Sequence, residues 1–148
     1  AKADLDGALA SAQYPDFETA PETRKVIAES FAHATLAECL DALEKAAATG
    51  NKPATDILNV IATRSPTSVA VAFRQIADGR ALDLDDCMRM EYRIASRMLA
   101  GHDFYEGVRA VLIDKDGAPV WKPASTDEVK PEMVNAYFAN LGERELSF

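Results

Sequence analysis

Residues 83–101 read DLDDCMRMEYRIASRMLAG, and this stretch decides the fold class. Met90, Ile94 and Met98 recur every four residues, so they share one face of a helix of about 17 residues. The acidic side chains of its first turn favour the positive end of the helix dipole. Gly101 is expected to close the helix in a left-handed conformation. The stretch therefore predicts a long amphipathic helix.

Helical spacing continues outward from this stretch along almost the whole chain. Thr35 and Glu38 have the spacing of a capping box, and Ser65 before Pro66 is a strong helix start. Together with these signals, the apolar spacing predicts helices at residues 4–12, 22–32, 35–49, 54–63, 66–78, 83–101, 104–113 and 130–140. A loop at 14–21, a turn at 115–119 and an extended segment at 120–123 separate some of them. The expected fold class is all-α, with residues 1–148 as a single helical region.

Composition narrows the class of protein. The chain has 148 residues, is 48% hydrophobic and carries a formal charge of -8, which fits one domain and disfavours nucleic-acid binding. It lacks an apolar run of the roughly 20 residues that a membrane span requires. We expect no metal and no disulfide framework, because Cys39, Cys87, His33 and His102 are widely spaced. No signal peptide is visible, so the chain is not expected to be secreted.

Three arginines lie on one stripe of the long helix. Arg89, Arg93 and Arg97 are spaced at four residues, opposite the apolar face. Guanidinium groups bind phosphate oxygens bidentately, so the stripe could hold a phosphate-bearing ligand. Pairing with acidic neighbours, or exposure to water, is the favoured alternative.

Two further stretches combine candidate chemical groups. Residues 101–109 place His102, Asp103 and Glu106 within two helical turns, which suggests acid/base chemistry, but helix capping is the favoured interpretation. Residues 114–123 place two lysines around a tight turn, with the one tryptophan of the chain beside them. The turn is either a ligand site for a phosphate or a surface turn anchored by the tryptophan, and the sequence leaves both open.

The order of five motifs is more specific than any one of them. They are SPTS at 65–68, FRQ at 73–75, MEYR at 90–93, GHDFYEGVRAVLIDKD at 101–116 and WKP at 121–123. In this order they closely resemble the C-terminal part of 3-hydroxyisobutyryl-CoA hydrolases, a branch of the crotonase (enoyl-CoA hydratase/isomerase) superfamily.

The resemblance implies a thioester hydrolase of valine catabolism that releases 3-hydroxyisobutyrate from coenzyme A. It implies that the catalytic residues and the oxyanion hole belong to an upstream crotonase ββα-spiral core that is absent from this chain. The helical region would pack on that core, cover the acyl-CoA pocket and be inactive alone. No residue of the chain is therefore assigned a catalytic role. No cofactor is expected, and coenzyme A enters only as part of the substrate.

The resemblance and the turn together give five candidate binding residues for the substrate. Phe104 would form a wall of the acyl or pantetheine tunnel, and Lys115 would meet a phosphate of coenzyme A. The other candidates are Arg109, Trp121 and Lys122. An apolar helix face left exposed would also favour a homo-oligomer.

The expected partners are the acyl-CoA substrate, the upstream core of the same protein and a second copy of the chain, in bacterial cytoplasm or the mitochondrial matrix. Two other functions stay open. One is a hydratase or isomerase of the same superfamily. The other is a non-catalytic helical module that binds an acidic partner through Arg89, Arg93 and Arg97.

Overall fold

The computed structural model describes residues 19–148, so the helix expected at 4–12 and most of the loop at 14–21 lie outside the described residues. Seven α-helices follow, with a π-helix, η1, and two short 3₁₀ helices, η2 and η3, and this described part contains no strand. The elements are α2 Pro21–Ser30, α3 Leu36–Ala48, α4 Lys52–Ala62, α5 Pro66–Gly79, α6 Leu84–Met98, α7 His102–Val108, η1 Arg109–Ile113, η2 Thr126–Glu128, α8 Pro131–Phe138 and η3 Gly142–Arg144. None of the described helices is long and apolar enough to span a membrane.

Local capping chemistry sets most helix starts where the sequence predicts them. The capping box is confirmed, because the Thr35 hydroxyl accepts from the Glu38 amide at 3.3 Å and the Glu38 carboxylate accepts from the Thr35 amide at 3.0 Å. Ser65 caps α5 by accepting from the Ser68 amide at 3.2 Å. Asp83 caps α6 in the same way.

Two local predictions are wrong around the end of α6. Gly101 has a φ of -90°, outside the left-handed region, because α7 begins at the next residue and Gly101 serves as its N-cap. The single helix expected at 104–113 is instead α7 followed by the π-helix η1. The wider turn of η1 could not be read from apolar spacing, because the tertiary contacts of the following turn decide it.

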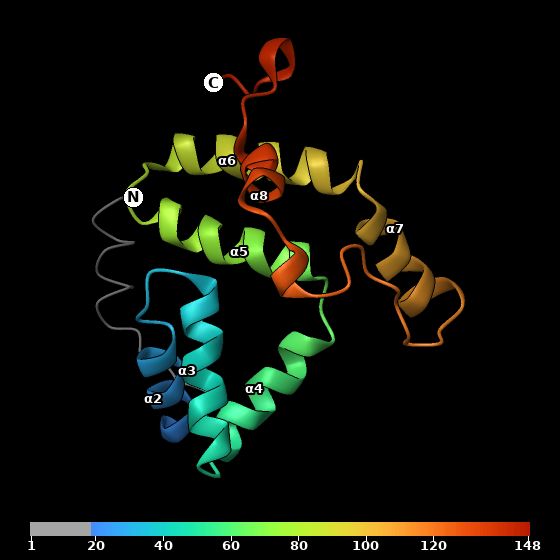
Figure 1. The fold of residues 1–148 in the computed structure, drawn as a ribbon. Helices are drawn as coiled ribbons and strands as arrows, with labels where there is room; N and C mark the ends of the chain where they lie inside the picture. The colour runs from blue at the N-terminus through green and yellow to red at the C-terminus, as the bar shows by residue number, and fades with distance from the viewer. Residues whose placement is uncertain (1–18) are drawn as a thin grey trace, which may run out of the picture.

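The helices bury two separate apolar clusters. The first lies between α2, α3 and α4, where Leu43 and Ala54 are completely buried against Val26. The second lies between α5, α6 and α8, around Val71 and Ile94. In Figure 1, α8 crosses α6, while α2, α3 and α4 form a second group. The four-residue spacing of the apolar side chains thus produces two helical groups rather than one core.

The α7 helix and η1 project to one side of these two groups, and the chain then turns back along them (Figure 1). Two long-range hydrogen bonds attach this projection to the junction of α4 and α5. The Ser65 hydroxyl donates to the Asp103 carboxylate at 2.5 Å, and the Trp121 indole N–H donates to the Thr63 carbonyl at 3.2 Å. The projection therefore has a fixed position relative to the helical body.

The first cluster yields a stability prediction. Replacing the completely buried Leu43 with alanine should lower the free energy of unfolding by about 2–5 kcal/mol, because it leaves a cavity between α2, α3 and α4. Val60→Ala is the matched control, since Val60 is 53% exposed on α4, and its cost should stay within about 1 kcal/mol. Urea unfolding followed by circular dichroism measures both. An equal loss of unfolding free energy in Leu43→Ala and Val60→Ala would contradict the buried position of Leu43.

Candidate functional site

All five predicted site residues fall in one unit, made of α7, η1 and the segment that returns along them. Three backbone amides of the returning segment donate to successive acceptors on the helical side. Gly117 donates to the Ala110 carbonyl at 3.0 Å, Val120 to the Glu106 carboxylate at 2.7 Å and Lys122 to the Asp103 carboxylate at 2.9 Å. Residues 117–122 thus run antiparallel to α7 and η1. We call residues 114–122 the α7 turn.

Arg109 binds the α7 turn to the end of α7. Its Nε and Nη2 donate to the two carboxylate oxygens of Glu106 at 2.9 and 2.8 Å, which is a bidentate pair. Its Nη1 donates to Asp114 at 2.7 Å and to Asp116 at 2.6 Å, and Nη2 also donates to the Ala118 carbonyl at 3.2 Å. These bonds use every N–H donor that a guanidinium group has.

The network shifts the pKa values of Glu106, Asp116 and Arg109 in the direction that keeps these groups ionised. Hydrogen bonds from Arg109 and from the Val120 amide lower the pKa of Glu106 to about 2. Hydrogen bonds from Arg109 and from the Ala118 amide lower the pKa of Asp116. The same carboxylates, Glu106 first, raise the pKa of Arg109. The network therefore stays charged across the physiological pH range.

Lys115 lies at the tip of the α7 turn. Its φ is 57°, in the left-handed region, where a residue with a side chain carries a cost of about 1 kcal/mol. Its side chain is exposed and makes no hydrogen bond or ion pair within residues 19–148. A strained residue with a free ammonium group is a reasonable candidate for a ligand contact.

Trp121 and Phe104 line the two sides of the unit. Trp121 is half-buried, with its ring against Gly107, where an added Cβ would lie 3.3 Å from the ring. Together with its bond to Thr63, this contact makes Trp121 the anchor of the turn. Phe104 is 43% exposed and packs edge-to-face on Tyr105, with ring centroids 5.4 Å apart. The Lys122 side chain is exposed, and no hydrogen bond or ion pair engages it in the described part of the chain.

The acidic groups of α7 act as tethers, so the capping role expected for them is wrong. No side chain caps the start of α7, and Asp103 instead accepts from Ser65, 38 residues away in sequence. His102 Nδ1 lies 3.0 Å from the other oxygen of Asp103. The order is Ser65, Asp103, His102, with the carboxylate in the middle. A nucleophilic serine needs a base such as histidine beside it, so this arrangement does not activate Ser65.

Two arginines of the stripe on α6 pair with carboxylates, as the favoured alternative predicted, and the third binds backbone carbonyls. Arg89 pairs with Asp86 at 2.8 Å, and Arg93 pairs with Glu145 at 2.7 Å. Arg97 donates to the carbonyls of Tyr137 and Asn140, both at 3.4 Å. The stripe therefore fixes residues 137–145 to α6.

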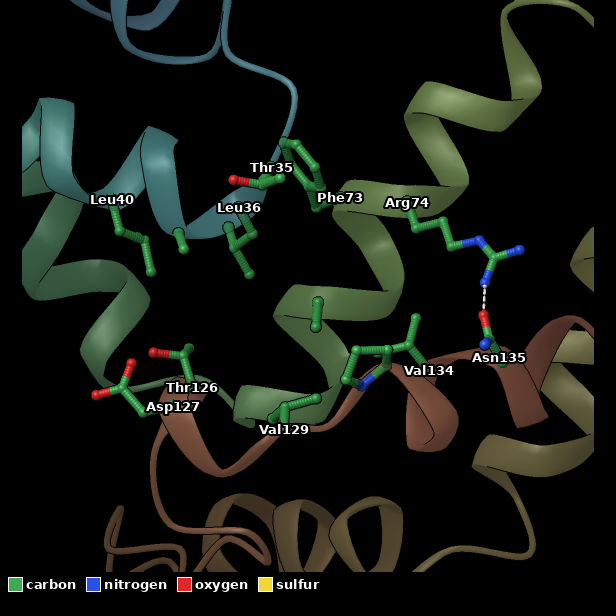
Figure 2. Close-up of a pocket in the computed structure, with 13 residues that line it drawn as sticks. Thr35, Leu36, Leu40, Phe73, Arg74, Thr126, Asp127, Val129, Val134 and Asn135 are labelled. Carbon is green, nitrogen blue, oxygen red and sulfur yellow. Dashed lines mark hydrogen bonds between the residues drawn. The ribbon is translucent and has the colours of Figure 1, made fainter.

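A pocket of about 420 Å³ lies between α3, α5, η2 and α8 (Figure 2). Its walls are mainly apolar, and Arg74 points along one side toward Asn135, to which it donates a hydrogen bond. Arg74 also pairs with Asp78 at 3.1 Å and lies 4.2 Å from the ring centre of Phe138. The residues that line it are Thr35, Leu36, Ala37, Leu40, Ala70, Phe73, Arg74, Thr126, Asp127, Val129, Pro131, Val134 and Asn135.

None of the five predicted site residues lines this pocket. Sequence reasoning missed it because its walls come from four elements that no local spacing connects. The sequence singles out the start of α3 only for its capping box. Within residues 19–148, no group of three or more His, Cys, Asp or Glu side chains could hold a metal ion.

Comparison with known proteins gives the family. The model of the family described as Enoyl-CoA hydratase/isomerase matches residues 2–138. The chain belongs to this family. The similarity to 3-hydroxyisobutyryl-CoA hydrolases expected from the motifs is confirmed, since several relatives carry that name.

The relatives are much longer than this chain. The mitochondrial 3-hydroxyisobutyryl-CoA hydrolase of Rattus norvegicus is 45% identical over 72% of this chain and 28% of its own length. For the protein of the same name in Homo sapiens the identity is 42%, over 80% of this chain and 30% of the relative. The chain thus spans less than a third of these relatives.

Solved structures of the same family resemble the whole chain. A carnitinyl-CoA dehydratase from Mycobacterium thermoresistibile matches with a TM-score of 0.77 and 37% identity, over 97% of this chain and 41% of that one. An enoyl-CoA hydratase from Rhodobacter sphaeroides matches with a TM-score of 0.74 and 30% identity, over 99% of this chain and 44% of that one.

These matches correct the expected fold class. We expected an all-α region outside a crotonase core, packing on a core absent from the chain. The family model and both structures instead align with nearly the whole chain, so its residues are part of the family's own fold. The residues described are helical, yet helical periodicity reports only which face of each helix is buried. It does not report the larger fold to which the helices belong.

The Arg109 network predicts a pH dependence. Because Arg109 lowers the pKa of Glu106 from 4.5 to about 2, this pair stabilises the folded chain above pH 4.5, and the contribution is lost as pH falls toward 2. Carboxyl-carbon NMR should show Glu106 titrating near pH 2, and Arg109→Met should raise that midpoint toward 4.5. Glu38 is the internal control, because Thr35 lowers its pKa on α3 and the substitution leaves that contact intact. A wild-type midpoint near 4.5 would contradict the network.

Proposed function

We propose that this chain is part of an acyl-CoA thioester hydrolase that acts on 3-hydroxyisobutyryl-CoA in valine catabolism. One observation carries the proposal, namely that relatives named 3-hydroxyisobutyryl-CoA hydrolase are 40–48% identical to this chain. The GHDFYEGVRAVLIDKD motif forms α7, η1 and the first residues of the α7 turn, and so most of the candidate site. Coenzyme A then serves as part of the substrate, and no separate cofactor is proposed.

We assign the α7 turn to recognition of the coenzyme A part of the substrate. Lys115 and Lys122 supply exposed ammonium groups without a carboxylate partner in the described chain, which suits phosphate oxygens. Phe104 and the edge of Trp121 supply apolar surface for pantetheine or adenine. This unit would cover one side of the acyl-CoA pocket.

The described residues supply binding groups rather than a nucleophile. The Ser65 hydroxyl donates to Asp103, whose carboxylate also ties the hydroxyl to α7, and no histidine lies beside it to act as the base of a catalytic triad. We therefore place the catalytic groups outside residues 19–148 and expect the chain to be inactive alone.

A hydratase or isomerase is the second candidate. The family model carries that description, and the Rhodobacter sphaeroides structure is named an enoyl-CoA hydratase. A non-catalytic module that binds acidic partners is less well supported, because Arg93 is already paired with Glu145 and Arg97 binds two carbonyls.

A second copy of the chain is the proposed assembly partner. Three consecutive side chains of η1, Val111, Leu112 and Ile113, are between 63% and 69% exposed. An exposed apolar run of this kind is typical of a surface that another protein covers. We propose a homo-oligomer through η1.

The curated relatives are mitochondrial, and the similar structures come from bacteria, so the matrix and the bacterial cytoplasm are both proposed compartments.

The activity is tested by thiol release from 3-hydroxyisobutyryl-CoA. The longer protein that carries this chain should release coenzyme A, and the 148-residue chain should release none, since its described residues lack an activated nucleophile. The human hydrolase is the positive control. Hydration of an enoyl-CoA without thiol release would favour the second candidate, and absence of both reactions would contradict the proposal.

Coenzyme A binding is tested on the chain itself. Trp121 is the one tryptophan, so its fluorescence reports on the α7 turn. Lys115→Met should weaken coenzyme A binding about 10-fold, or ~1.4 kcal/mol, because a charge-assisted contact to phosphate is lost. Lys45→Met is the control, since Lys45 pairs with Asp41 on α3. Equal affinity for wild type and Lys115→Met would remove Lys115 from the site.

A further inference from the structure

Lys115 lies in sequence between two carboxylates, Asp114 and Asp116. Two negative charges beside a lysine would repel an approaching phosphate and weaken its attraction to the ammonium group. In the structure both carboxylates turn toward Arg109 instead, and they share its Nη1 at 2.7 and 2.6 Å. Arg109 therefore offsets part of the negative charge that flanks Lys115.

Arg109 has no donor left for a ligand. Its five hydrogen bonds go to Glu106, Asp114, Asp116 and the Ala118 carbonyl, which account for every N–H of the guanidinium group. A phosphate could bind Arg109 only by displacing one of these acceptors. Any influence of Arg109 on a ligand must therefore pass through the residues that it holds.

The same contacts fix the backbone around Lys115. Arg109 binds the residues immediately before and after it, and Asp116 also accepts from the Ala118 amide at 2.9 Å. The left-handed φ of Lys115 persists because the flanking residues are held on both sides. The result is a turn that directs one uncompensated positive charge outward.

We propose that Arg109 is a positioning residue for anion recognition by the α7 turn. It holds the turn in the shape that presents Lys115, and its single positive charge offsets part of the charge of Asp114 and Asp116, which reduces their repulsion of the phosphate groups of coenzyme A. This inference rests on the proposed function, because it takes Lys115 as the phosphate contact.

A double-mutant cycle tests the route through Lys115. Trp121 fluorescence gives the Kd for coenzyme A and for pantetheine, which lacks phosphate. Arg109→Met should weaken coenzyme A binding about 10-fold and change pantetheine binding less than about twofold. The double variant Arg109→Met with Lys115→Met should lose less affinity than the product of the two single losses, because the positioning effect of Arg109 acts through Lys115. If the loss of affinity in the double variant equals the product of the two single losses, the proposal is overturned.

Matched variants test whether Arg109 acts on the charges of Asp114 and Asp116. Arg80→Met removes an arginine just after α5, away from the turn, and should leave the Kd for coenzyme A unchanged. Adding Asp114→Asn and Asp116→Asn to Arg109→Met should recover about threefold or more of the lost affinity, because the repulsion is removed. No recovery would overturn the claim that Arg109 acts by compensating these carboxylates.

Amide hydrogen exchange tests the turn without any ligand. The amides of Gly117, Ala118 and Val120 are hydrogen-bonded in the turn, and Arg109→Met should lower their protection about 10-fold or more. Unchanged protection together with unchanged affinity would overturn the proposal. If wild type fails to bind coenzyme A while protection still depends on Arg109, the proposed function and the anion role fail, and the turn-holding role stands.

Discussion

The bidentate pair between Arg109 and Glu106 is the interaction on which the candidate site depends. Glu106 sits near the end of α7 and also accepts from the Val120 amide, so it joins helix and returning segment. Arg109 extends the same network to Asp114 and Asp116. Because charge-assisted bonds are stronger than neutral ones and all donors are used, the turn has one preferred shape. The network holds the residues on both sides of Lys115.

The rest of the molecule holds that unit in place. Two helical groups bury separate clusters, and the projection is attached at their junction through Ser65 and Thr63. These contacts explain why the titratable groups of α7 are structural. Asp103 lies between a serine and a histidine, an order that orients the helix and does not activate a nucleophile. The tethers are therefore structural, and the exposed tip carries the proposed binding groups.

The sequence predicted the helices and their caps well, but it predicted neither the pocket nor the fold class. The Thr35 capping box and the Ser65 start were predicted correctly, because local spacing decides helix caps. The sequence also favoured a carboxylate partner for Arg93, but that partner, Glu145, lies 52 residues away and was not identified. The pocket beside Arg74 was missed, since its walls come from separated elements. The fold class was wrong because periodicity identifies helices without identifying the fold that contains them.

The sequence by itself determined where most helices begin, which faces they bury and which family the motifs resemble, since these depend on neighbours within a few residues. Only the tertiary structure decided the roles of the charged residues. Arg109 and Lys115 were both candidate ligand contacts in the sequence. Folding satisfies every donor of Arg109 and leaves the Lys115 ammonium exposed, because the chain reverses after η1 and brings three carboxylates to one guanidinium group.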